Sequence, residues 1–224
     1  MAGVIADGSR ADAGAFLSRL VRLDPNAVVR LRPGPDGRVL IWARLPFDPL
    51  VVRGLAAAVE RDVTVRAGEL LTAVGAGREL PAPRDADWRW PLPPPAAVDV
   101  ETVPADEVLR IAAAAADTAR AALSSGVGGR AVGSRRVRDA LLDHVPIVVE
   151  ADGADGQKTG GQRVEVPQRL VQAVVRMGFV TPGSRVIVRR AAAWVGLAGE
   201  HGAAWHRPIG ESLNLHVSPY QTNG

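Results

Sequence analysis

The chain has 224 residues, of which 47% are apolar and none is cysteine, and its formal net charge is +3. A chain of this length and composition buries a substantial core, while the lack of cysteine excludes disulfides, thiolate metal sites and thiol catalysis. Of the 27 basic residues only Lys158 is a lysine. Because arginine, alanine, glycine, proline and valine have GC-rich codons, this arginine excess does not by itself indicate a nucleic-acid partner.

The first ten residues (1–10) predict a flexible leader. They contain the acidic residue Asp7 and no long apolar run, unlike a secretory signal. No stretch of the sequence approaches the roughly 20 apolar residues that cross a bilayer. We therefore expect a soluble cytoplasmic protein.

Residues 11–80 predict an antiparallel α+β unit. Apolar residues such as Phe16 and Leu20 recur at helical spacing, which predicts an amphipathic helix over 11–23. Apolar residues alternate with polar ones on both sides of the turn at Pro33–Gly37, which predicts a β-hairpin. We expect the opening helix to cover the sheet. The shorter predicted elements are β-prone runs at 50–53 and 63–65 and a helical segment at 67–74.

Residues 81–97 predict a linker, because six prolines between Pro81 and Pro95 prevent regular structure. Trp88 and Trp90 lie inside this linker, and two exposed indole rings are costly in water. We expect the two rings to dock into a groove between the flanking halves or against a partner chain. The linker is therefore predicted to be an ordered strap.

Residues 98–210 predict a second unit of mixed helices and strands, followed by a tail at 211–224. Pro104 takes the first position of a predicted helix, and Gly178 stops a later one. A segment rich in glycine and aspartate at 151–163 predicts a mobile loop. The other predicted elements are a strand at 98–103, a helix at 134–143, a buried strand at 145–149, a helix at 167–177 and a hairpin of 185–190 with 194–198.

The fold class is therefore α+β. It combines an antiparallel sheet with a covering helix in the N-terminal part, a Pro/Trp-rich strap, and a mixed helix–strand C-terminal part. Whether the two units pack as one body stays open at this point.

Two features of the sequence bear on catalysis. The glycines at 126–133 resemble a phosphate loop, but a helix precedes them and no lysine follows, which favours an ordinary loop. Glu200, His201 and His206 are the one cluster of candidate metal ligands, yet their spacing favours a surface loop packed by Trp205. With no Gly-x-Ser-x-Gly motif and no paired carboxylates on a predicted face, we lean against an enzyme and expect no cofactor.

Arginines on two predicted helices give the best indication of a binding partner. Three lie at the start of the 134–143 helix, where the helix dipole favours anions, so an anionic partner would offset their cost. Three polar residues lie opposite the apolar face of the 167–177 helix, and arginine and glutamine are side chains that read base edges in DNA. The candidate residues are Arg135, Arg136, Arg138, Arg169, Gln172 and Arg176.

Three segments carry a resemblance to known sequences: Asp85–Pro94, Arg138–Pro146 and Val166–Gly178. In these segments the chain resembles a set of uncharacterised actinobacterial proteins, a family of unknown function from high-GC Gram-positive bacteria. The resemblance implies a bacterial cytoplasmic origin and assigns no activity and no site residues.

These observations favour a non-catalytic binding or regulatory protein. Its arginine-rich C-terminal face would meet an anionic partner, either nucleic acid or an acidic protein. One alternative is a protein-interaction scaffold or homo-oligomer with no role in nucleic-acid binding, in which Trp88 and Trp90 are buried against another chain. A second alternative is a small metal- or nucleotide-dependent enzyme. We expect no membrane partner.

Overall fold

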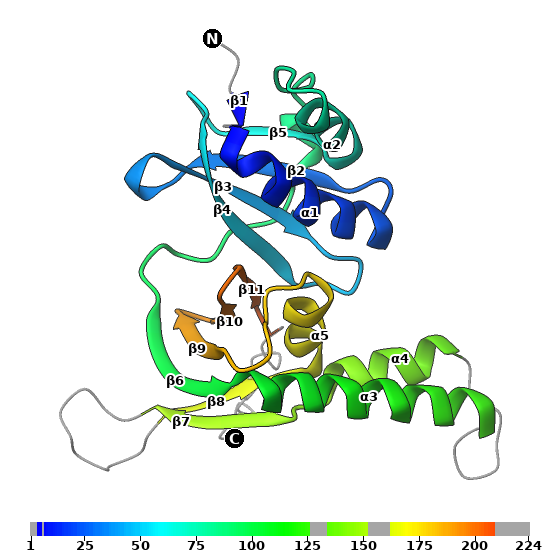
Figure 1. Ribbon diagram of the computed structural model, residues 1–224. Helices are drawn as coiled ribbons and strands as arrows, with labels where there is room; N and C mark the ends of the chain where they lie inside the picture. The colour runs from blue at the N-terminus through cyan, green and yellow to red at the C-terminus, as the bar shows by residue number, and fades with distance from the viewer. Residues whose placement is uncertain (1–3, 6, 126–133, 152–161, 209–224) are drawn as a thin grey trace, which may run out of the picture.

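The computed structural model describes residues 4–5, 7–125, 134–151 and 162–208 (Figure 1). The fold is α+β, as the sequence predicts. The helices are α1 (Asp7–Leu23), α2 (Ala67–Gly75), α3 (Ala105–Ser125), α4 (Ser134–Asp143) and α5 (Gln168–Arg176). The strands are β1 (Val4–Ile5), β2 (Val28–Pro33), β3 (Arg38–Arg44), β4 (Leu50–Ala58), β5 (Val63–Arg66), β6 (Val98–Pro104), β7 (Ile147–Ala151), β8 (Gln162–Val166), β9 (Arg185–Ala191), β10 (Trp194–Gly199) and β11 (Gly202–His206).

One antiparallel sheet runs through both halves of the chain. Its order is β5-β2-β3-β4-β11-β10-β9-β6, and β1 pairs with the far end of β4. The two halves join where β4 pairs with β11, with Leu50 opposite Trp205 and Val52 opposite Ala203. Because this joint is a hydrogen-bonded strand pair, the two halves share a continuous sheet. β7 and β8 form a separate hairpin.

The two faces of the sheet have different coverings, because alternate residues of a strand point to opposite sides. On one side, Ile41 belongs to the main core, which includes residues of α1, α2, α3 and α5. There Phe16 of α1 stacks on Phe179, with ring centroids 6.2 Å apart. On the other side, Trp42 belongs to a smaller cluster that includes the strap. The helices therefore cover one face and the strap crosses the other.

The strap is ordered by contacts with the first half and by its own tryptophans. The backbone N–H of Thr64 on β5 donates to the Asp85 carboxylate at 2.7 Å, and the Arg84 N–H donates to the Thr64 carbonyl. Trp88 is buried, and its indole N–H donates to the Trp90 carbonyl at 2.7 Å. The cluster around Trp88 draws on both halves: Trp42 and Leu50 from the first, and Ala191, Trp194 and Trp205 from the second.

Several elements differ from the sequence-based expectations. Residues 4–5 pair with β4 and α1 begins at Asp7, so part of the expected leader has regular structure. β8 and β11 were not expected, because the predicted mobile loop at 151–163 overlaps the start of β8 and the segment of β11 was expected to be a surface loop. The strand expected to be buried at 145–149 is half exposed, since β7 pairs only with β8 and Val148 remains 45% exposed.

The expected mobile loop overlaps residues 152–161, which lie outside the described residues, as does the tail at 211–224. Among the described helices, none is long and apolar enough to cross a membrane.

A candidate binding pocket at the joint of the two halves

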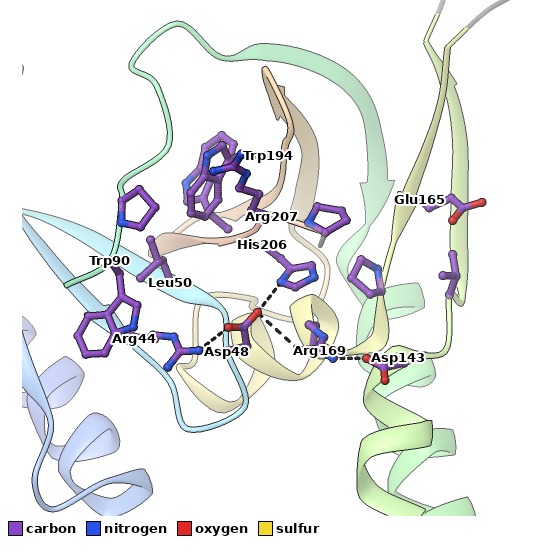
Figure 2. A pocket seen from close by; sticks show the side chains of 15 residues that line it. Arg44, Asp48, Leu50, Trp90, Asp143, Glu165, Arg169, Trp194, His206 and Arg207 are labelled. Atoms are coloured by element: carbon purple, nitrogen blue, oxygen red, sulfur yellow. Dashed lines mark hydrogen bonds and ion pairs between the residues drawn. The ribbon is translucent and has the colours of Figure 1, made fainter. Parts of the chain in front are cut away.

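A pocket of about 680 Å³ opens on the strap side of the sheet, where β4 meets β11 (Figure 2). Both halves line it, because its walls come from the β3–β4 loop, the strap, the start of α5 and the end of β11. The labelled lining residues are Arg44, Asp48, Leu50, Trp90, Asp143, Glu165, Arg169, Trp194, His206 and Arg207.

The apolar part of the pocket is formed by Trp194, Trp205 and Leu50, all nearly buried. Trp205 lies directly opposite Gly196 in the β10–β11 pair. A Cβ atom added at Gly196 would lie 2.7 Å from the nearest atom of the Trp205 ring. A glycine within a strand often marks such a close approach. Gly196 therefore lets the indole ring lie close against β10.

The strap supplies one wall of the pocket through Trp90 and Pro91. The Trp90 ring meets Trp88 edge to face, with centroids 5.3 Å apart. The Arg44 guanidinium lies 5.3 Å from the Trp90 ring centroid, a cation–π distance. Arg44 thus links the strap wall to the β3–β4 loop.

Asp48 stands at the centre of the polar side of the pocket, as Figure 2 shows. Its backbone has φ of 96°, a region that few residues other than glycine adopt and that aspartate tolerates better than most. Its carboxylate accepts a hydrogen bond from Arg44 at 2.6 Å, and Nδ1 of the buried His206 lies 3.0 Å away. Contact with His206, followed by that with Arg44, holds the pKa of the Asp48 carboxyl well below its usual range.

Arg169 at the start of α5 connects the same loop to α4. One guanidinium nitrogen lies 3.6 Å from the Asp48 carboxylate, and another pairs with Asp143 at the end of α4. The side chain also donates to the Phe47 carbonyl at 3.3 Å and is only 18% exposed. The polar side of the pocket is therefore held in place by internal ion pairs.

The lining of the pocket combines aromatic rings with charged side chains. The residues that line the pocket in the described part of the chain include no serine, threonine, cysteine or lysine. Among the described residues, no group of three His, Cys, Asp or Glu side chains is placed to hold a metal ion. Asp48 orients the imidazole of His206, whose Nδ1 lies 3.0 Å from its carboxylate. The pocket is an aromatic hollow with a charged rim, which suits a ligand.

Comparison with protein families covers nearly the whole chain. Residues 92–211, more than half of the sequence, match a family described as a domain of unknown function (DUF8185). The chain belongs to this family. Residues 4–90 match a second domain of unknown function (DUF8010), so the boundary between the two domains falls at residue 91, within the strap. None of the curated proteins matches the sequence. The resemblance seen in the sequence implied a family of unknown function, and these matches confirm that expectation.

Solved structures show what this DUF8185 chain resembles in fold. The beta subunit of the DNA polymerase of Streptococcus pyogenes matches at TM-score 0.54 and 12% identity, over 92% of this chain and 64% of that one. The pol III beta protein of Caulobacter crescentus matches at TM-score 0.51 and 15% identity, over 91% and 64%. A Thermotoga maritima DNA polymerase III beta subunit matches at TM-score 0.50 and 13% identity, over 92% and 64%. The chain therefore shares their fold and spans less than two thirds of their length.

The arginines predicted at α4 have no described contact with the pocket of this DUF8185 chain. Arg135 and Arg138 are exposed, and the side chain of Arg136 lies outside the described residues. Arg169, by contrast, is bonded to Asp143 at the far end of α4. Eight residues separate Arg135 from that aspartate, about 12 Å along the helix. Arg135 therefore lies at the opposite end of α4 from the contact between Asp143 and Arg169.

The face of α5 predicted to be free makes internal contacts. The Gln172 amide donates to the Ala112 carbonyl of α3 at 3.3 Å. Arg176 donates to the Gln172 side chain at 3.4 Å and lies over the Phe47 ring, 5.5 Å from its centroid. The physical reason is that α5 is covered on two sides, by the sheet and by α3, which the period of one helix does not reveal.

The candidate metal ligands lie at opposite ends of β11. Glu200 and His201 occupy the β10–β11 turn, whereas His206 is in the pocket. Five residues of extended strand place His201 and His206 about 16 Å apart, so they do not form one ligand cluster. The glycine segment at 126–133 lies outside the described residues.

Sequence reasoning missed the residues that shape the polar side of the pocket, above all Asp48, Arg44 and Arg207. The available signal was the segment Pro46–Pro49, because prolines around a polar residue between two strands indicate a tight turn. Nothing local indicated that this turn meets the end of β11.

Proposed function

We propose that this chain is a non-catalytic binding protein that holds an apolar segment of a partner protein in the pocket at the joint. The observation that carries the proposal is the hollow formed by Trp90, Trp194 and Trp205. Large aromatic side chains in concave sites dominate the energetics of protein interfaces. The partner's apolar side chain would take the place of water on these rings.

The rim supports the proposal because its central charges already have partners. Asp48 is satisfied by Arg44 and lies against His206, and Arg169 is bonded to Asp143. A pocket whose shape is fixed before binding loses less conformational entropy when a ligand arrives. The fold shared with polymerase beta subunits, one of which is described as a sliding clamp, also supports a binding role over a catalytic one.

A random peptide library displayed on phage tests this proposal. We expect enrichment of peptides with aromatic or branched apolar residues, and loss of their binding in Trp90→Ala and Trp194→Ala variants. Leu123→Ala is the matched control, because Leu123 is 55% exposed on α3, outside the pocket. Circular dichroism establishes that each variant is folded. Enriched peptides that bind both pocket variants as tightly as the wild type would refute the proposal.

A second candidate function follows from the exposed arginines of α4. Arg135 and Arg138 are solvent-accessible, and the solved structures of this fold are named as DNA polymerase subunits. We propose that these side chains, with Arg136, contact nucleic acid as the anionic partner. A mobility shift on duplex DNA across a salt series tests this, with Arg135→Glu/Arg138→Glu against Arg22→Glu as control. Each lost phosphate contact lowers the salt slope by about 1, and no shift at low salt contradicts the candidate.

Self-association is a third arrangement that the sheet favours. β6 is the last strand of the sheet in the described part of the chain, and its residue Val98 is 57% exposed. Open strand edges pair readily with other chains. Light scattering coupled to gel filtration measures the mass directly, and a monomer at high concentration contradicts this arrangement.

A further inference from the structure

Three arginines around the pocket have no side-chain acceptor within the described part of the chain. Arg207 is exposed at the end of β11 and lines the pocket (Figure 2). Arg66 and Arg89 line a second, smaller hollow. Arg44 and Trp90 line both hollows, so Trp90 stands between them. We call these two adjoining hollows the groove: within the described part of the chain, guanidinium groups without a side-chain acceptor lie on both sides of Trp90.

The acidic side chains in this groove are already engaged. Asp48 and Asp143 are bonded to arginines of the pocket, and the Glu165 carboxylate lies 3.1 Å from Arg163. In the second hollow, Asp87 lies 3.9 Å from Arg84 and Asp24 accepts the Asn26 backbone N–H at 2.9 Å. The lining has as many arginines as carboxylates, but Arg163 and Arg84, which pair with two of these carboxylates, lie outside it. Arg66, Arg89 and Arg207 are therefore left without a carboxylate partner in the described part of the chain.

The position of Arg66 at the start of a helix also favours an anionic ligand. It occupies the N-cap position of α2 and makes no capping hydrogen bond. The positive end of the helix dipole disfavours a cation there and favours an anion. A carboxylate placed between Arg66 and Arg89 would relieve this repulsion.

We propose that the pocket partner is an acidic protein segment, with an apolar anchor on the tryptophans and carboxylates on both sides of it. The carboxylates on one side meet Arg207, and those on the other side meet Arg66 and Arg89. This proposal rests on the proposed function, because it assigns the class of partner that the same pocket takes.

The distribution of charge favours a peptide over a nucleic acid. Besides Arg207 the pocket contains the carboxylates Asp48, Asp143 and Glu165. A nucleic-acid backbone carries a negative charge at every nucleotide and would be repelled there. A peptide can place neutral residues over the carboxylates and acidic ones over the arginines.

Fluorescence anisotropy with two defined probes tests the inference. One is a fluorescein-labelled peptide with a central Leu-Phe pair flanked by glutamates, and the other replaces each glutamate by glutamine. We expect the acidic probe to bind more tightly and to weaken with salt. An Arg66→Gln/Arg89→Gln/Arg207→Gln variant should lose about tenfold for the acidic probe, from about 1.5- to 5-fold per exposed ion pair, and little for the neutral one.

The matched control changes three exposed arginines outside the groove, Arg22→Gln/Arg138→Gln/Arg185→Gln, which alters the net charge equally. Equal binding of both probes, or an equal loss in the control variant, overturns the inference and leaves the peptide-binding function in place. If the library and both probes fail to bind, the proposed function itself is wrong. If single-stranded DNA displaces the acidic probe and binds more tightly, the assigned class of partner is wrong.

Discussion

The packing of Trp205 on Gly196 gives a prediction whose sign can be worked out from the structure. A methyl group at residue 196 would lie 2.7 Å from the nearest ring atom, against ordinary contact at 3.4 Å or more, so the ring has to move by about 0.7 Å. Overpacking of this kind costs about 1–3 kcal/mol. Replacing a strand glycine where space is available instead stabilises a protein by about 0.5–1 kcal/mol. Gly196→Ala should therefore destabilise the wild type.

The sign should reverse when the indole is removed. In a Trp205→Leu background the smaller side chain leaves room for the methyl group, so Gly196→Ala should be neutral or stabilising. Urea unfolding of the four proteins gives the free energy of unfolding of each, and the double-mutant cycle isolates the coupling between the two positions. The displaced ring should also weaken binding of the library peptides to the Gly196→Ala protein. An equal cost of Gly196→Ala in both backgrounds would refute this reasoning.

Three further predictions concern the polar contacts around the pocket. Because the pKa of Asp48 is lowered in the folded state, its contribution to stability is full above about pH 4 and is lost as the pH falls through the folded-state pKa. Asp48→Asn should therefore lower the melting temperature at pH 7 and make the melting temperature fall less steeply in acid. An unchanged fall of the melting temperature in acid contradicts this. Trp88→Phe removes the indole bond to Trp90 and should cost about 0.5–1.5 kcal/mol in urea unfolding. Arg169→Met should lower the free energy of unfolding by about 1–3 kcal/mol, because it removes two ion pairs. The control Arg138→Met, at an exposed residue, should change the free energy of unfolding by no more than about 0.5 kcal/mol. Equal changes in the two variants would mean that the ion pairs of Arg169 do not stabilise the protein.

Elements with local signals are the ones that the sequence predicted well. The helix at 134–143, which is α4, was predicted from Ser134 as a capping residue. Gly178 follows Met177, the C-cap residue of α5, and adopts φ of 67°, the left-handed conformation that makes glycine a helix stop. The hairpin around Pro33–Gly37 likewise follows from turn residues between alternating strands. Each of these signals lies within a few residues of the structure it specifies.

The pocket could not be predicted because its parts are brought together by long-range pairing. Asp48 meets His206 only because β4 and β11 are neighbours in the sheet. β11 itself is short and rich in glycine and alanine, so its sequence favoured a loop. The contact of Gln172 with Ala112 could not be predicted for a related reason, because it depends on where α3 packs.

The position of the pocket would couple the proposed binding to the joint between the halves. A segment seated on Trp205 and Trp90 would touch β11 and the strap at once, so its binding energy would hold the halves together. A ligand at a hundred times its Kd stabilises the folded state by about 2.7 kcal/mol. Variants that loosen the joint, such as Gly196→Ala, should therefore lose stability and affinity together. Substitution of Arg207 should change affinity alone, because this side chain has no acceptor to lose within the described chain.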